Sequence, residues 1–285
     1  MKKRLRLLLV FFGLVIVAAC AGGDDGPGTI ANHGNADGDD GGYIGETIDP
    51  WNLPPANAPF DYQLGGAYIP PEGVTVVSRD RNDSPAIGLY NICYINGFQI
   101  QPDEEALWDD DLILLDGNGD PIIDEDWNEM ILDIRTPAKR TRIATVVGGW
   151  IEACAANGFD AVEIDNLDTY SRSGGRITQD DAVAYMALLS PLAHANSLAV
   201  AQKNSTELLA RRVEMGTDFA VAEECSRYNE CHEYIDAYGL GVLMIEYRSD
   251  DFNSGCSAYG TTHSIILRDV PLRKPGQSGY VYDGC

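Results

Sequence analysis

The sequence is poor in the residues from which most metal and nucleophile sites are built. It has only four histidines, and none of them is spaced as a pair of metal ligands. It contains no CxxC pair, no GxSxG nucleophile motif and no glycine-rich phosphate loop. The segment DGNGDPIIDEDW (116–127) begins like a calcium loop, but Pro121 replaces the required glycine and Trp127 stands where a bidentate glutamate is needed. We therefore expect an acidic turn here, and neither a metal nor another cofactor in the protein.

Basic residues are also scarce. The chain has 20 Lys and Arg against 44 Asp and Glu, which gives a formal net charge of −24. Beyond the first six residues, the only lysines are Lys139, Lys203 and Lys274. An acidic surface repels nucleic acid and anionic lipid and attracts cations, so we expect no nucleic-acid partner. A polycationic substrate and adaptation to salt are both consistent with this charge.

No apolar run is long enough for a comfortable membrane-spanning helix. The run at residues 7–19 follows a basic start, MKKRLR, and ends in VAAC. This pattern predicts a lipoprotein signal peptide over residues 1–19, cleaved before a lipid-modified Cys20, with an uncleaved anchor as the alternative. Residues 20–49 are rich in Gly, Asp and Asn, which predicts a flexible tether. We therefore expect an exported monomer at the bacterial cell envelope, held to the membrane only through its lipid.

Six of the seven cysteines remain after Cys20 is set aside. An even number in an exported protein is typical of disulfides, and six cysteines allow fifteen connectivities. Cys225 and Cys231 are close enough in sequence to close one loop. The pairs that we expect are Cys93 with Cys154, Cys225 with Cys231, and Cys256 with Cys285.

Residues 50–285 alternate short β-branched or aromatic runs with helical patterns, which predicts βα units in one domain. Helices are expected over 137–158, 178–197 and 205–216, with Thr178 and Ser205 as N-caps and Gly216 as a stop. Nine segments have strand character, one more than an eightfold barrel needs. They are 60–66, 73–80, 87–96, 130–135, 160–166, 198–204, 218–224, 242–247 and 264–269. We expect an α/β fold of the (β/α)8 TIM-barrel type rather than an open doubly wound sheet.

Polar residues end six of these strands. They are Arg79 and Asp80, Asp133 and Arg135, Asp165 and Asn166, Lys203 and Asn204, Glu223 and Glu224, and Glu246. In a parallel barrel these ends meet at one mouth, where the active sites of the fold lie. Aromatic rings near strand ends suit either stacking on a sugar or core packing. The candidates are Tyr62, Tyr90, Tyr94 and Tyr247.

The strand VEID shows which side chains enter the barrel. Alternation points Glu163 and Asp165 inward, with Asp165 at the mouth and Glu163 one layer below. A buried carboxylate must be paired, hydrogen-bonded or protonated, and Arg135 or Lys203 is the expected partner of Glu163. Asp165 is the first candidate for catalysis.

Cleavage of a glycosidic bond needs a second carboxylate. Glu223, Glu224 and Glu246 are the candidates. Alternation places Glu223 on the same strand face as Phe219 and Val221, but a bulge at the strand end would turn Glu224 inward instead. The sequence leaves this choice open.

In this order, the segments FDYQLGG, NICYINGFQ, LDIR, GFDAVEIDNLDTYSR, AQKN, FAVAEECSRYNEC, IEY and ILRD resemble glycoside hydrolase family 114, the endo-α-1,4-polygalactosaminidases. The resemblance implies a (β/α)8 barrel that cleaves α-1,4-linked galactosamine polymers internally. It implies Asp165 and Glu223 as the catalytic pair and favours Glu223 over Glu224. Deacetylated galactosamine is cationic near neutral pH, which an acidic mouth would attract.

The residues then expected to bind or position substrate are Arg79, Asp80, Tyr94, Glu163, Asn166, Lys203, Asn204 and Glu246. Two alternatives stay open. One is a non-catalytic polysaccharide-binding lipoprotein on the same barrel, because a fold alone does not confer activity. The other is a glycosidase for a different sugar.

Overall fold

The structure is a computed structural model, and it describes residues 51–285. The predicted signal peptide, the lipid-modified Cys20 and the tether lie outside the described residues. Within residues 51–285, no helix has both the length and the apolar character needed to cross a membrane.

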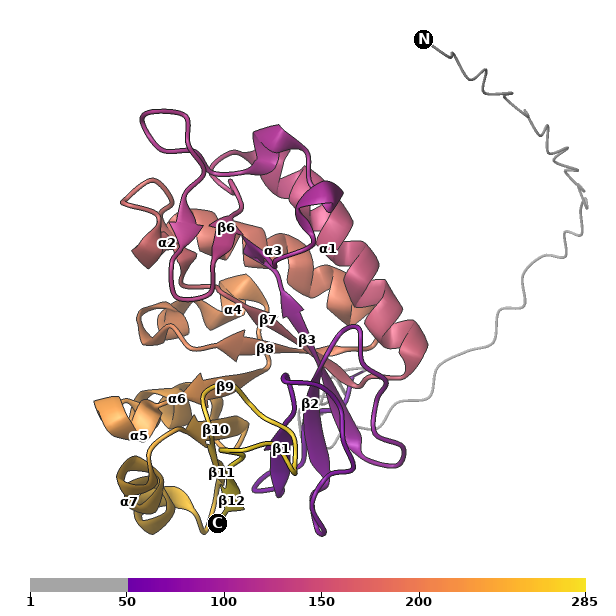
Figure 1. Ribbon diagram of the computed structural model, residues 1–285, viewed down its shortest axis with the longest axis vertical. Helices are drawn as coiled ribbons and strands as arrows, with labels where there is room; N and C mark the ends of the chain where they lie inside the picture. The colour runs from indigo at the N-terminus through magenta and orange to yellow at the C-terminus, as the bar shows by residue number, and fades with distance from the viewer. Residues whose placement is uncertain (1–50) are drawn as a thin grey trace, which may run out of the picture. The chain divides into compact units, whose positions relative to one another are not determined.

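Eight parallel strands form a nearly closed barrel (Figure 1). They are β1 (Phe60–Tyr62), β2 (Val76–Asp80), β3 (Tyr90–Asn96), β7 (Ala161–Asp165), β8 (Ala199–Lys203), β9 (Phe219–Glu223), β10 (Val242–Glu246) and β11 (Ser264–Arg268). A ninth strand, β12 (Tyr282–Gly284), pairs antiparallel with β11. Arg268 joins β11 to β1, because its Nη1 lies 2.8 Å from Asp61 Oδ1 and both side chains are fully buried. This ion pair links the first and last parallel strands.

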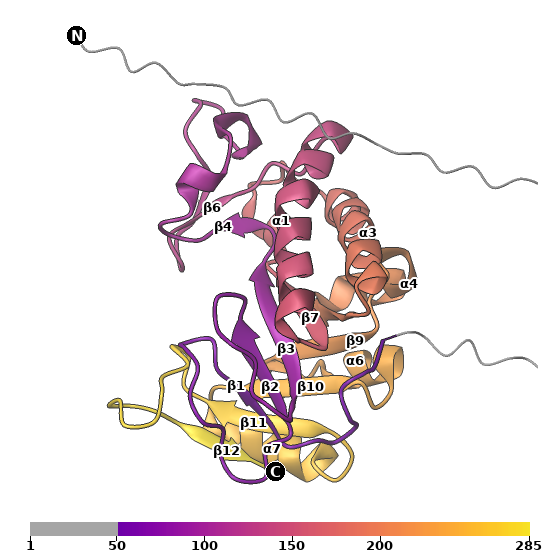
Figure 2. The same cartoon turned by 90° about the vertical axis from the view of Figure 1, so that its right-hand side faces the viewer.

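Helices follow five of the eight parallel strands. They are α1 (Pro137–Asn157), α2 (Thr169–Arg172), α3 (Gln179–Ala195), α4 (Arg212–Met215), α5 (Cys225–Tyr228), α6 (Cys231–Tyr238) and α7 (Ser249–Tyr259). The two longest, α1 and α3, pack side by side on the outside of the barrel (Figure 2). Residues 63–75 and 81–89 link β1 to β2 and β2 to β3 without a helix. The strands thus form a barrel of the expected TIM type, although helices do not follow all eight of them.

Capping side chains explain where the two long helices begin. The Thr136 side chain accepts a hydrogen bond from the Lys139 backbone N–H at the start of α1. Thr178 forms a capping box with Asp181 at the start of α3. Ser205 also stands at an N-cap position, but its side chain makes no capping hydrogen bond, and the element that follows is a 3-10 helix, η3 (Thr206–Arg211).

The segment between β3 and α1 replaces a simple loop with a small antiparallel sheet. It contains β4 (Gln99–Ile100), two 3-10 turns, η1 (Glu105–Leu107) and η2 (Asp110–Leu112), then β5 (Ile123–Asp124) and β6 (Glu129–Ile131), in the sheet order β4-β6-β5. Figure 2 shows this sheet beyond the end of β3. The predicted strand 130–135 belongs here, so it is the one outside the barrel. The acidic turn is also present, because Asp116 Oδ1 accepts hydrogen bonds from the backbone N–H groups of Asn118 and Asp120.

Side-chain alternation in β7 follows the prediction. Ala161 packs inside the barrel with Ile92 and Phe219. Val162 and Ile164 belong to the core between the sheet and the helices. Glu163 and Asp165 therefore share the inner face with Ala161.

Three disulfides join the pairs expected from the sequence: Cys93–Cys154, Cys225–Cys231 and Cys256–Cys285.

The described chain begins at the amino ends of the strands, where the Trp51 ring stacks on His194 with centroids 3.7 Å apart. His194 in turn contacts Asp218 at 2.9 Å, directly before β9. Trp51 thus enters the domain at the end of the barrel opposite the mouth.

Candidate active site

Lys203, at the end of β8, lies at the centre of a charged cluster at the mouth. Its Nζ is 3.3 Å from Asp165 Oδ1 and 3.1 Å from Glu223 Oε2. A third carboxylate, Glu163, lies 3.1 Å away. Burial alone would lower the pKa of Lys203, but the surrounding carboxylates outweigh burial and raise that pKa well above its usual value. Lys203 therefore remains a cation that holds three acids together.

Asp165 ends β7 and faces the mouth. Its Oδ2 accepts a hydrogen bond of 2.8 Å from the Tyr94 hydroxyl on the neighbouring strand β3. Burial would raise the pKa of Asp165, but Lys203, the Asn166 backbone N–H and Tyr94 lower it below its usual value. Asp165 is therefore ionised at neutral pH.

The structure places Glu223, and not Glu224, beside Asp165. Phe219 and Val221 pack inside the barrel, and regular alternation brings Glu223 to the same face without a bulge. The Tyr247 hydroxyl donates to Glu223 Oε1, and Asn204 Nδ2 donates to its Oε2 at 3.2 Å. Glu224 turns away in a left-handed conformation (φ 56°) and pairs with Arg227.

Glu163 forms the layer beneath this pair. Its Oε1 accepts a hydrogen bond of 2.5 Å from the Tyr62 hydroxyl, and its Oε2 accepts one of 2.9 Å from Ser78. Burial raises the pKa of Glu163 by more than Lys203 lowers it. Glu163 is fully buried, so it supports Lys203 from below. Of the two partners expected for Glu163, Lys203 is therefore the correct one. The role in substrate binding expected for Glu163 stays a prediction.

A cleft of about 820 Å³ opens above the cluster. Asp165 and Glu223 line it. Of the residues expected to bind substrate, those that also line the cleft are Asp80, Tyr94, Asn166, Lys203 and Asn204. Asn166 and Asn204 have positive φ angles of 66° and 48° directly after β7 and β8, a conformation that asparagine tolerates better than most residues. The chain can therefore turn directly after β7 and β8 while Asp165 and Lys203 keep their inward orientation.

Most of the sequence matches one family model. The model of glycoside-hydrolase family GH114 matches residues 45–285. The chain belongs to this family. It is therefore a glycosidase.

Solved structures share the fold of this GH114 chain. Aspergillus fumigatus Ega3, in a complex with galactosamine, is 20% identical with a TM-score of 0.68, over 82% of this chain and 98% of that one. The glycoside hydrolase domain of PelA from Pseudomonas aeruginosa is 14% identical with a TM-score of 0.54, over 78% of this chain and 98% of that one. A search of curated protein sequences finds no match.

Two residues of the GH114 chain expected at the mouth lie elsewhere. Arg79 alternates with Ser78 and Asp80, so it points away from the barrel interior, where it donates to the carbonyls of Tyr68 and Ser84. Glu246 alternates with Ile245 in the same way. It is fully buried, and its Oε1 accepts a hydrogen bond of 2.7 Å from the Ser226 backbone. Neither Arg79 nor Glu246 lines the cleft, so the structure does not place them where the expected contact with substrate would need them.

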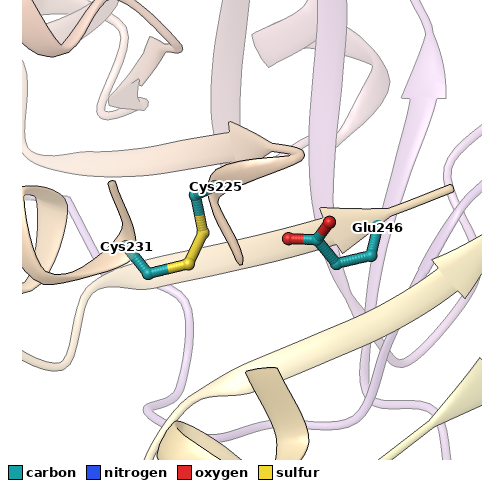
Figure 3. A group of neighbouring side chains, drawn as sticks. All are labelled: Cys225, Cys231 and Glu246. Carbon is teal, nitrogen blue, oxygen red and sulfur yellow. A yellow bond between two sulfur atoms is a disulfide. The ribbon is translucent and has the colours of Figure 1, made fainter. Parts of the chain in front are cut away.

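The Glu246 carboxyl group points toward the Cys225–Cys231 disulfide (Figure 3). The two sulfurs are bonded to each other, so they offer no thiolate to a metal. The Glu246 carboxylate instead joins β10 to the turn that follows Glu223, through its hydrogen bond from the Ser226 backbone.

Other strand-end expectations also change. Asp133 and Arg135 pair with each other outside the mouth, where Lys139 also contacts Asp133 at 2.6 Å. Tyr90 begins β3 at the opposite end of the barrel and donates to the Asn52 carbonyl. Tyr62 and Tyr247 do reach the site, but as hydrogen-bond donors to its carboxylates.

Glu129 on β6 lines the same cleft, although no sequence pattern indicates this. Its Oε2 accepts a hydrogen bond of 2.8 Å from Asn96 Nδ2, and Asn96 Oδ1 accepts one of 3.0 Å from Asn166. Burial raises the pKa of Glu129 from 4.5 to about 7, against the lowering by Asn96. Only the folded position of the β3–α1 segment brings Glu129 to the site.

Replacing Glu129 by Gln is expected to stabilise the protein increasingly as pH rises from 4.5 to 8. The pKa of Glu129 is higher in the folded state, at about 7, than in the unfolded state, at 4.5. Between these two values, folded wild-type protein keeps the proton on Glu129 while unfolded protein has lost it. Wild-type stability therefore falls between about pH 4.5 and 7, and the variant lacks this loss. Unfolding midpoints at pH 4.5 and 8 measure the effect. The exposed Glu125→Gln is the matched control, and an equal shift in both variants would contradict the prediction.

Proposed function

We propose that this protein is an endo-acting hydrolase that cleaves α-1,4 linkages in galactosamine-containing polysaccharide. The observation that carries the proposal is the Asp165–Lys203–Glu223 arrangement on three adjacent strands at the mouth of the cleft. Two carboxylates flanking one bond are what glycoside hydrolysis requires. A protein that only bound polysaccharide would not need this pair.

Asp165 acts as the nucleophile and Glu223 as the general acid and base. Asp165 attacks the anomeric carbon while Glu223 gives a proton to the leaving oxygen; Glu223 then takes a proton from the water that releases the sugar from Asp165. Both acids contact Lys203 Nζ, so the two contacting oxygens are no farther apart than the sum of 3.3 Å and 3.1 Å. Two acids that share one ammonium group favour the short spacing of retaining enzymes, about 5–5.5 Å, over the wider spacing of about 6.5–9.5 Å that leaves room for a water in inverting enzymes. We therefore propose a retaining mechanism.

The substrate is a cationic aminosugar polymer. Acidic side chains surround the cleft beyond the catalytic pair: Asp80, Glu129, Asp168, Glu207, Glu224 and Glu230. A cleft with one sign of charge concentrates substrates of the other sign. Ega3, the structural neighbour with a TM-score of 0.68, is described in complex with galactosamine, which fits the same sugar class.

The proposed activity is tested by incubating the protein with α-1,4-polygalactosamine, its N-acetylated form and chitosan. We expect a ladder of oligosaccharides from polygalactosamine, as endo-cleavage gives, and little product from chitosan. Proton NMR of the first products should show the α-anomer, since retention preserves the configuration of the cleaved bond. Release of single sugars only would contradict endo-cleavage, and initial β-anomer would contradict retention.

The protein acts outside the cell, anchored through a lipid on Cys20. Three disulfides within residues 51–285 fit an oxidising compartment. The basic and apolar start of the sequence supports the anchor, and the barrel acts as a monomer on its polymer.

A further inference from the structure

Glu129 is a carboxylate in the cleft that the reaction described above does not use. Its side chain is nearly buried, with 8% of the residue exposed, yet it lines the cleft beside Asp165. Asn96 satisfies Oε2, whereas no donor from residues 51–285 reaches Oε1. An acid held in this way has an oxygen available to a ligand.

No cation within residues 51–285 forms an ion pair with Glu129. The nearby Arg172 is engaged by other acids: its Nε lies 2.9 Å from Asp124 Oδ2 and its Nη1 lies 2.8 Å from Asp168 Oδ2. Arg172 Nη2 donates to Asn166. Burying a carboxylate without a countercharge costs free energy, and a cationic ligand would offset this cost.

Trp127 lies two residues before Glu129, in the turn that joins β5 to β6. It lines the cleft and is 59% exposed, although large aromatic side chains are usually more buried. A flat indole in a cleft offers a surface for the apolar face of a ring. Gln101, from the same β3–α1 segment, also lines the cleft and can hydrogen-bond a hydroxyl.

We propose that Glu129 and Trp127 form a subsite for one aminosugar unit of the polymer, adjacent to the reacting unit on the Asp165 side. Glu129 Oε1 pairs with the ammonium group of this unit, and Trp127 contacts its ring face. The small antiparallel sheet between β3 and α1 is thus a recognition element, which gives the enzyme a preference for deacetylated over N-acetylated units. This inference rests on the proposed aminosugar substrate.

The test compares Glu129→Gln with its parent on galactosamine oligomers and on N-acetylated oligomers of the same length. Affinities are measured by calorimetry in an Asp165→Asn background, where the ligand is not consumed, and kcat/KM is measured with Asp165 intact. Loss of one charge-assisted contact is expected to weaken binding of the amine oligomer at least about tenfold, which corresponds to about 1.4 kcal/mol. Binding of the N-acetylated oligomer should change less than about twofold, within the range of small surface effects.

Two further variants separate recognition from general effects. Glu125→Gln removes the same charge at an exposed position outside the cleft and should leave the affinity for both oligomers unchanged. Trp127→Ala should weaken the binding of both oligomers to a similar extent, because contact with a ring face does not distinguish an ammonium from an acetamide. Equal effects of Glu129→Gln on both oligomers, or no effect on either, would overturn the subsite. Absence of turnover in the parent would instead reject the proposed function, since the affinity comparison does not depend on turnover.

Discussion

Replacing Asp165 by Asn is expected to lower kcat by at least about a thousandfold, as removal of a nucleophile does in other hydrolases. The amide cannot form the covalent bond to the anomeric carbon that retention requires. Lys203 and Tyr94 still find a polar partner of the same shape, so the fold should survive. Reducing-end release from polygalactosamine measures the loss, and circular dichroism checks the fold.

The matched control for this change is Asp236→Asn on the exposed side of α6, which removes the same charge at a position that does not line the cleft. It should retain wild-type activity. A folded Asp165→Asn protein that keeps more than about a tenth of wild-type kcat would assign the nucleophile elsewhere, since loss of a covalent catalyst costs far more.

Replacing Lys203 by Met is expected to cost about 3–5 kcal/mol of unfolding free energy, because it leaves buried acids without their cation. Glu163 is fully buried, and Lys203 is its only ion-pair partner among residues 51–285. Activity should be lost as well, because Lys203 keeps the pKa of Asp165 low. Urea unfolding at pH 7 measures the stability.

The loss of unfolding free energy in Lys203→Met should be smaller at lower pH. There Glu163, whose pKa is already raised by burial, takes up a proton and no longer carries an unpaired charge. The double variant Lys203→Met with Glu163→Gln should recover part of the stability at pH 7. Lys274→Met removes a lysine that forms no ion pair within residues 51–285 and should change stability by less than about 0.5 kcal/mol. A deficit that is the same at every pH, with no recovery in the double variant, would mean that lost packing and not unpaired charge is responsible.

Strand alternation accounts for which of the expected residues reach the mouth and which do not. Ser78, Glu163 and Lys203 meet because each lies an even number of residues from an inward-facing position on its own strand. Arg79 and Glu246 were expected at the mouth only because they end strands, although the same alternation turns them outward. This alternation can be counted in the sequence itself. Applied to every strand, it places Arg79 and Glu246 on the outer face of the barrel.

Other features depend on long-range contacts and could not be predicted. Alternation favours Glu223, but only the turn that sends Glu224 to Arg227 excludes a bulge. The strand pattern of residues 130–135 is real, yet its antiparallel pairing with β4 and β5 takes it out of the barrel. Glu129 enters the cleft for the same reason, so a sequence reading based on parallel strand ends misses it.

The position of Trp51 separates the start of the described chain from the cleft. Its stacking on His194 fixes this start at the amino ends of the strands, whereas the cleft opens at their carboxyl ends. Residue 51 and the substrate therefore meet the barrel at opposite ends. A change at the Trp51–His194 contact should accordingly alter the stability of the domain without changing the residues that a polymer meets in the cleft.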